Sequence, residues 1–234
     1  MSILYQYSHF LAVSKGCYDG GLSIKELKKH GNLGLGTFHA LDGELVVIDN
    51  QFYHCANGQT RLAEDSELLP WAAIANLGAG RSFTIKNIVS IEELQSVLLA
   101  HVPTKNYPAA LRIKAHAANI ALGSVPKQTK PYKAISAIIE DSILINTGEI
   151  TADLGGFYTP EFMFPMKAKG IHLHFVDENR RIGGHVLELQ LISAEIYWQQ
   201  LTAINIIFPQ ADEYKNANLS LADNLPKFED KLNQ

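Results

Sequence analysis

A chain of 234 residues with 47% hydrophobic and 19% charged residues is long enough for one large domain or two small ones with a real core. Its net charge of −4 and its lack of a basic tract argue against nucleic acid as a partner, and no apolar run approaches the ~20 residues of a membrane span. The amino terminus lacks the basic start and long apolar run of a secretory signal, so we expect a cytoplasmic protein. Cys17 and Cys55 are then expected to be free thiols.

Two helices are predicted from their capping residues. Ser23 is followed three residues later by Glu26, and Ser90 is followed at the same spacing by Glu93, which is the capping box of a helix amino terminus. After Ser90, apolar residues recur at helical spacing and predict a face that packs on a sheet. These residues are Ile91, Leu94, Val97 and Leu98.

Most of the other predicted elements are strands. The first two flank Asn50, which is typical of a tight hairpin turn. In chain order the predicted strands cover residues 45–49, 51–55, 71–75, 109–115, 135–139, 171–176, 186–196 and 204–208. Because strands outnumber helices and do not alternate with them regularly, the pattern favours an α+β fold with mixed sheets over a doubly wound fold.

The polar segment Lys127 to Lys133 (KQTKPYK) contains Pro131 and reads as a linker between two units. We therefore expect an N-terminal mixed-sheet domain over residues 1–128. A β-rich C-terminal domain over residues 129–234 would then carry the chemistry described next. The polar tail from residue 216 is expected to be loose or to fold back over a site.

The segment from Gly170 to His185 predicts a metal site. On a strand, His172 and His174 are two residues apart, so both imidazoles point to the same face. A polar turn follows, and His185 begins the returning strand, where it can approach the first pair. Three imidazoles with an open fourth position are typical of a catalytic zinc site, although imidazole also suits iron, copper and nickel.

Two other interpretations of these histidines stay open. Ordinary hairpin histidines would face solvent, because the alternating apolar residues Ile171, Leu173 and Phe175 occupy the other face. A cupin-type barrel would add Glu178 as a ligand, but its second half-motif is absent. The remaining histidines are scattered and are expected to be surface or hydrogen-bonded core residues; they are His9, His30, His39, His54, His101 and His116.

A glycine-rich segment, residues 34–45, leads into the very apolar strand LVVID. It is not a phosphate loop, because it lacks the Gly-Lys-Ser/Thr ending. Glu44 begins this strand, and taken by itself its carboxylate is expected to be exposed at the strand mouth.

Four stretches of the chain resemble the bacterial alpha-acetolactate decarboxylase family. The most specific is GLGTFHALDGELVVIDNQFY at 34–53. The others are LYQYS at 4–8 with GCYDG at 16–20, SVPKQ at 124–128 with PY at 131–132, and HLHF at 172–175 with GGHVL at 183–187. Their order and spacing match the family across nearly the whole chain.

The resemblance implies a two-domain α/β fold with mixed sheets, a metal site between the domains, and a homodimer. It also implies the site residues. These are His172, His174 and His185 as zinc ligands, together with Glu44, Thr37 and a C-terminal glutamate, for which Glu229 is the best match. The implied place of Glu44 in the active site reverses the expectation of an exposed carboxylate.

The family reaction converts 2-acetolactate into acetoin and carbon dioxide, as a step of acetoin and butanediol formation. The substrate offers a ketone oxygen and a neighbouring hydroxyl, a natural chelate for an open metal position. A Lewis acid beside these oxygens stabilises the charge that departing carbon dioxide leaves behind. Glu44 and Glu229 are candidates for proton transfer, with the larger role for Glu44. No motif for an organic cofactor occurs, so a metal is the only cofactor expected.

One position departs from the family pattern. The family has an active-site arginine just before the Ser-Val-Pro segment, where this chain has Gly123. Arg112 is out of register, and Lys127 or Lys130 would lack the planar two-donor grip of an arginine. Losing one such contact costs about 2–4 kcal/mol. The alternative to an active decarboxylase is therefore a divergent member with weak, altered or lost catalysis, acting on or binding a related 2-hydroxy-3-keto acid.

Overall fold

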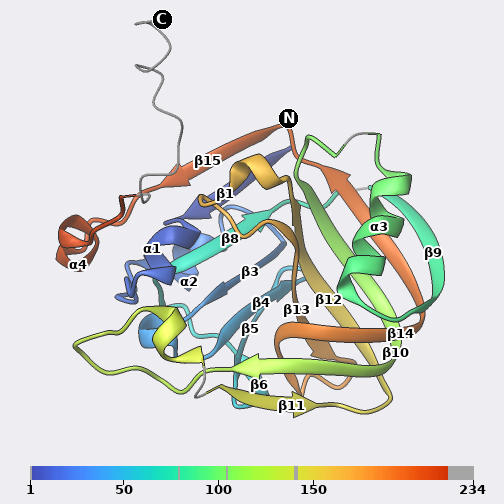
Figure 1. Ribbon diagram of the computed structural model, residues 1–234, viewed down its shortest axis with the longest axis horizontal. Helices are drawn as coiled ribbons and strands as arrows, with labels where there is room; N and C mark the ends of the chain where they lie inside the picture. Colours follow the sequence, from blue (N-terminus) through green and yellow to red (C-terminus); the bar gives the residue numbers. More distant parts are fainter. Residues whose placement is uncertain (1, 79, 104, 140–141, 221–234) are drawn as a thin grey trace, which may run out of the picture.

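The chain folds into two large β-sheets that lie face to face, with a small two-stranded sheet and a few helices around them (Figure 1). The structure is a computed structural model that describes residues 2–78, 80–103, 105–139 and 142–220. The α+β class with mixed sheets and few helices, predicted from the sequence, is confirmed.

The first sheet has seven strands. Their order is β15 (Ala203–Ile207), β1 (Ile3–Tyr7), β8 (Trp71–Ala75), β3 (Leu33–Thr37), β4 (Glu44–Ile48), β5 (Gln51–Ala56) and β6 (Gln59–Leu62). Neighbours are antiparallel except β1 and β15, which pair in parallel and make this sheet mixed. Asp49 and Asn50 join β4 to β5 with φ values of 50° and 63°, the backbone of a tight hairpin turn.

The second sheet has six strands. Their order is β11 (Ile143–Asn146), β10 (Ala109–Ser124), β12 (Ile150–Thr159), β13 (Gly170–Asp177), β14 (Gly183–Gln200) and β9 (Arg81–Ile88). The long strand β14 also pairs with β10, so the strands β10, β12, β13 and β14 close on themselves. A separate pair, β2 (Leu22–Ser23) and β7 (Leu68–Leu69), forms a small third sheet.

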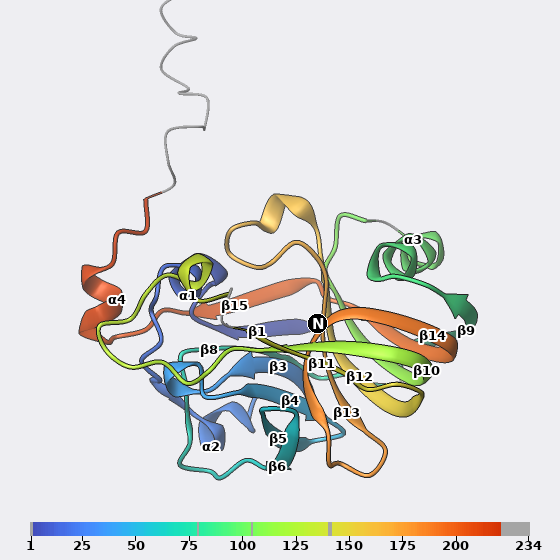
Figure 2. The same ribbon diagram turned by 60° about the horizontal axis from the view of Figure 1, so that its bottom comes forward.

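The helices are short and lie around the sheets. They are α1 (Phe10–Ser14), α2 (Ile24–Leu27), α3 (Ile91–His101) and α4 (Asp212–Asn216), with short 3-10 turns η1 (His39–Leu41), η2 (Ile135–Ala137) and η4 (Glu161–Met163). The hydroxyls of Ser23 and Ser90 accept hydrogen bonds from the backbone N–H groups of Glu26 and Glu93, as the capping boxes predict. Helix α3 packs on the second sheet, away from the first (Figure 2). Within the described ranges, no helix has the length and apolar character to cross a membrane.

The apolar strand β4 explains how the sheets pack. Val46 and Ile48 belong to the core between the two sheets, whereas Leu45 and Val47 belong to the core on the outer side, under α2. Side chains alternate along a strand, so Glu44 shares the face of Val46 and Ile48. The first residue of this strand therefore points toward the second sheet.

Seven of the eight predicted strands are present, and the strand predicted at 135–139 is wrong because the chain forms the 3-10 turn η2 there. A short apolar run does not distinguish a strand from a helical turn. Strands β10 and β14 extend well beyond the predicted bounds. Several strands were not predicted, among them β1, β3, β9, β11 and β12. Both cysteines are free, as expected.

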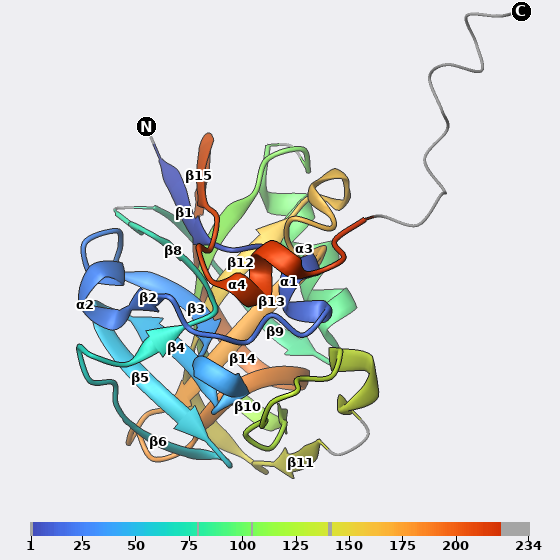
Figure 3. The ribbon, with the colours of Figure 1, turned by 90° about the vertical axis from the view of Figure 1, so that its left-hand side faces the viewer.

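The two sheets do not divide the chain at residue 128. Strand β15 joins β1 in the first sheet, and β9 and β10 belong to the second (Figure 3). The segment predicted as a linker packs on the first half of the chain, because the backbone N–H of Gln128 donates to the carbonyl oxygen of Ala40 at 2.7 Å. The division into domains 1–128 and 129–234 stays a prediction.

Candidate metal centre and its cavity

The period-two spacing on β13 places two histidines toward the first sheet. Leu173 and Phe175 pack in the core of the second sheet, so His172 and His174 project the other way. That face is not open to solvent, because the first sheet covers it and His174 is only 1% exposed. His185, near the start of β14, is the direct cross-strand partner of His174.

Two glycines allow the strands to approach closely around these histidines. A Cβ at Gly156 on β12 would lie 2.0 Å from the carbonyl oxygen of His172, and one at Gly183 would lie 2.6 Å from the sulfur of Cys55. Neither separation is sterically possible. Larger residues would therefore push β12 or β14 away from the histidine group.

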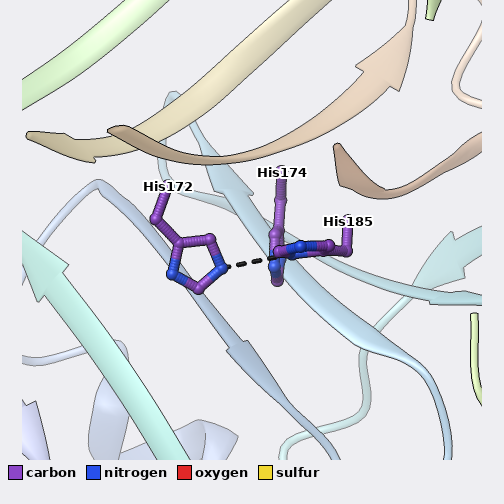
Figure 4. Close-up of side chains that lie close together, drawn as sticks. All are labelled: His172, His174 and His185. Atoms are coloured by element: carbon purple, nitrogen blue, oxygen red, sulfur yellow. Dashed lines mark hydrogen bonds between the residues drawn. The ribbon is translucent and has the colours of Figure 1, made fainter. Parts of the chain in front are cut away.

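The three imidazoles converge on one point (Figure 4). One nitrogen from each of His172, His174 and His185 lies within 4.8 Å of the others, and Nε2 of His172 is 3.2 Å from Nδ1 of His185. Two nitrogens bound tetrahedrally to one zinc at about 2.0–2.1 Å would stand about 3.3 Å apart. The donor set and its spacing therefore fit a single zinc-like ion.

A hydrogen bond orients the central histidine, His174. Nδ1 of His174 lies 2.8 Å from the carbonyl oxygen of Leu45, and since a carbonyl only accepts, Nδ1 carries the proton. Nε2 then keeps its lone pair for the ion. This carbonyl comes from β4 of the other sheet, so packing of the sheets fixes the tautomer of His174.

Burial keeps the imidazoles neutral. It lowers the pKa of His174 to about 3 and that of His185 to about 4. The pKa of His172 is also well below its usual value, through burial first and then the neighbouring His185 and His174. His172 and His185 are half-buried and line a cavity. Neutral imidazole is the form that binds metal, so the site is ready for an ion at neutral pH.

Three residues of the first sheet lie in register and form the cavity wall that faces the histidines. Trp71 pairs with Thr37, and Thr37 pairs with Glu44, so all three face the histidines. The ring of Trp71 stacks on His172 with centroids 5.8 Å apart. The hydroxyl of Thr37 donates to the carbonyl oxygen of Gly43 at 2.9 Å and so holds the backbone next to Glu44.

Glu44 is the acidic group of this wall. Its Oε2 lies 3.7 Å from Nε2 of His174, and its side chain is 21% exposed because it faces the cavity. Burial raises the pKa of Glu44 to about 8. The carboxyl group thus lies beside the histidine group rather than in bulk solvent, and at neutral pH it mostly holds a proton.

The histidines and Glu44 open onto one cavity of about 310 Å³, near the lower end of the size range of small-ligand sites. Its other lining residues are mostly apolar: Phe10, Val13, Thr37, Leu41, Trp71, Gly123, Ser124, Val125, Ile135, Ile139, Ser142 and Leu187. Among these described lining residues there is no lysine or arginine. The cavity therefore suits a small, mostly apolar molecule with a few oxygens for an ion.

Gly123 lies in this wall as the cross-strand partner of His185. A Cβ at this position would meet the side chain of Leu187 at 2.8 Å. The cationic residues considered as replacements for an arginine form ion pairs elsewhere and do not line the cavity. Arg112 pairs with Asp49 and Asp153, Lys127 with Asp42, and Lys130 with Asp19.

Two other glutamates considered for the site are not among the described residues that line the cavity. Glu229 is outside the described residues. Glu178 is exposed in the turn after β13 and is not part of the histidine group, so the cupin-type interpretation lacks its carboxylate ligand. Sequence reasoning placed Trp71 on a strand but missed its place in the site. Only the cross-strand register with Thr37 brings it there.

The chain matches the family model for alpha-acetolactate decarboxylase over residues 4–221. The alpha-acetolactate decarboxylase from Raoultella terrigena is 32% identical over 225 residues, which cover 96% of this chain and 86% of that protein. The one from Methanosarcina mazei is 30% identical over 230 residues, which cover 97% of this chain and 80% of that protein. The crystal structure of the Bacillus subtilis strain 168 alpha-acetolactate decarboxylase superposes with a TM-score of 0.91 at 28% identity and covers 95% of each chain. A Staphylococcus aureus protein described as similar to this enzyme gives 0.88 at 26% identity, covering 93% of this chain and 94% of its own.

Proposed function

The chain belongs to the alpha-acetolactate decarboxylase family, and we propose that it converts 2-acetolactate into acetoin and carbon dioxide with one divalent ion, zinc in the first instance, held by His172, His174 and His185. It is a carboxy-lyase by its family. One observation carries the proposal of a metal: three neutral imidazoles converge at the wall of a cavity that leaves room for a chelating ligand.

The chemistry of the donor set supports this assignment. A bound divalent ion would act as a Lewis acid toward the ketone and hydroxyl oxygens of the substrate and so stabilise the charge left as carbon dioxide departs. The protein orients His174 for this through Leu45 and keeps all three rings unprotonated by burial. The mostly apolar cavity walls lower the local polarity and so strengthen the attraction between opposite charges.

Glu44 is the proposed proton donor. After carbon dioxide leaves, the carbon that carried it must receive a proton. A carboxyl group with its pKa raised to about 8 holds that proton at neutral pH. A cation bound at the histidines would lower this pKa toward neutrality, the range in which acid–base catalysis works best. Thr37 is proposed to act by holding the turn before Glu44.

The second interpretation is a family member with weak, altered or lost catalysis. It rests on Gly123 and on the lack of a cation among the described lining residues of the cavity. The family match does not favour it, because the histidines and Glu44 are present and share one cavity.

An activity assay with defined metal content tests the proposed function. Protein dialysed against a chelator should form acetoin no faster than the spontaneous decarboxylation of acetolactate. Adding Zn²⁺ should restore catalysis at about one ion per chain, and Co²⁺ or Mn²⁺ would identify the preferred ion. Full activity without metal would overturn the metal assignment. One bound ion per chain without acetoin formation would favour the second interpretation.

We also propose that the protein is a cytoplasmic homodimer that serves acetoin and butanediol formation. The dimer is supported by β15, which is an edge strand with exposed apolar residues such as Ile204 and Ile207, followed by Phe208. Apolar edge strands pair readily with another chain. Sedimentation equilibrium should give twice the chain mass of 25.8 kDa; a single-chain mass at all concentrations would exclude the dimer.

A further inference from the structure

The negative charge of the proposed substrate has no cationic partner among the described lining residues of the cavity. A 2-hydroxy-3-keto acid enters as a carboxylate anion, and its ketone and hydroxyl oxygens are directed to the histidines. Its carboxylate then faces walls whose described residues include no lysine or arginine. An anion in such apolar surroundings needs a positive charge nearby.

Lys167 is a buried cation beside this cavity. It lies in the segment between η4 and β13, where its backbone N–H donates to the carbonyl oxygen of Met163, and it is only 3% exposed. Its Nζ lies 4.6 Å from the ring centroid of Phe157 and 5.6 Å from that of Trp71. Within the described ranges, no carboxylate forms an ion pair with this ammonium group.

The two aromatic rings connect Lys167 to the histidine group. Phe157 is the cross-strand partner of His172, so both side chains project from the same face of the second sheet. Trp71 stacks on His172 and also lies under the ammonium group. Lys167 therefore lies behind the Trp71 end of the cavity, against the two rings that flank His172.

A cation in this position is incompletely compensated. Burial lowers the pKa of Lys167 to about 7, so without a bound anion the side chain is only partly protonated at neutral pH. The aromatic faces replace only part of the lost hydration of its ammonium form. An anion bound in the cavity would restore a partner for the charge. Lys169, two residues later, is by contrast exposed and paired with Glu161 at 3.3 Å.

We propose that Lys167 is a positioning residue that draws the substrate carboxylate to the Trp71 end of the cavity. This inference rests on the proposed function. The ketone and hydroxyl oxygens then face the histidines, and the bond to the departing carboxylate points away from them. Because Lys167 acts on the charge of the bound substrate rather than on the reacting carbon, its effect falls on KM more than on kcat.

The test compares Lys167→Met with the matched control Lys169→Met in the metal-loaded protein. Lys167→Met should raise KM for acetolactate about tenfold or more and change kcat by less than about threefold. Lys169→Met should leave both unchanged. Lys167→Arg, which keeps the charge, should recover most of the lost KM. Replacing an uncompensated buried cation with an apolar side chain of similar length favours the fold, so the methionine variant should stay folded and bind metal.

Direct binding separates this inference from the proposed function. Isothermal titration calorimetry can measure the affinity of the protein for 2-hydroxyisobutyrate, a carboxylate, and for its neutral amide. Neither measurement requires catalysis. Lys167→Met should weaken binding of the carboxylate about tenfold and leave the amide unchanged, whereas a purely structural defect would weaken both equally. Equal weakening of both ligands, or an unchanged KM and unchanged carboxylate affinity, would overturn the inference. A wild-type protein that binds the acid through Lys167 but forms no acetoin would instead contradict the proposed function.

Discussion

Replacing His174 with alanine is expected to release the metal ion and to lower the rate of acetolactate decarboxylation about a thousandfold. The side chain is 1% exposed, and its Nδ1–H donates to Leu45 across the two sheets, so no other residue can take its place. A Lewis acid supplies several kcal/mol of charge stabilisation, and each 1.36 kcal/mol is worth about tenfold in rate. Metal analysis after desalting and steady-state kinetics of acetoin formation measure the two effects.

His116→Ala is the matched control, because this histidine is exposed and pairs with Glu149 at the surface. It should keep both metal and activity. Because alanine at position 174 also leaves the Leu45 carbonyl without a partner, circular dichroism must show that the variant is folded. A folded His174→Ala protein with a full complement of metal and normal kcat would disprove the metal centre.

Replacing Glu44 with glutamine is expected to lower kcat about 10²–10⁴-fold while the metal stays bound. Glutamine keeps the size of the side chain but cannot deliver the proton that the carbon needs after carbon dioxide leaves. Glu178→Gln is the control, because Glu178 is exposed and separate from the histidine group. Metal loss on Glu178→Gln, or an unchanged kcat for Glu44→Gln, would contradict the assigned roles.

The same variant has an expected effect on the stability of the metal-free protein. Burial raises the folded-state pKa of Glu44 from 4.5 to about 8, so between these values the folded protein binds more protons than the unfolded chain. The free energy of unfolding should therefore fall as pH rises through this window, by a few kcal/mol. Glutamine at position 44 cannot ionise, so the free energy of unfolding of Glu44→Gln should fall less as pH rises. Urea unfolding at pH 5 and pH 8.5 tests it; identical pH dependence in both proteins would mean that Glu44 titrates normally.

Local patterns in the chain were enough to predict the histidine group. The two-residue spacing of His172 and His174 requires a shared face on any strand, and the polar turn before His185 requires a return along the same edge. The helix caps at Ser23 and Ser90 are equally local, since they depend on one side chain and a backbone group three residues away. The clustering of the three histidines and the two helix caps are confirmed, because strand and helix periodicity are properties of short segments. Metal binding by the histidines stays a prediction.

Other features depended on contacts between segments far apart in the chain. Whether His174 faces solvent or a cavity depends on the first sheet, whose Leu45 is 129 residues away in sequence. Trp71 enters the site only through its register with Thr37, and Lys167 only through the rings of Trp71 and Phe157. The apolar run at 135–139 lines the cavity as a turn, although its composition equally suits a strand.

The sequence by itself therefore determined which side chains are available for the proposed chemistry: three imidazoles on one hairpin and a glutamate at the start of an apolar strand. Only the tertiary structure decided their environment. Packing one sheet on the other buries the imidazoles, raises the pKa of Glu44 and leaves Lys167 without an ionic partner among the described residues. The physical reason is that burial and electrostatics depend on what covers a side chain, and that cover comes from distant strands whose pairing no local pattern specifies.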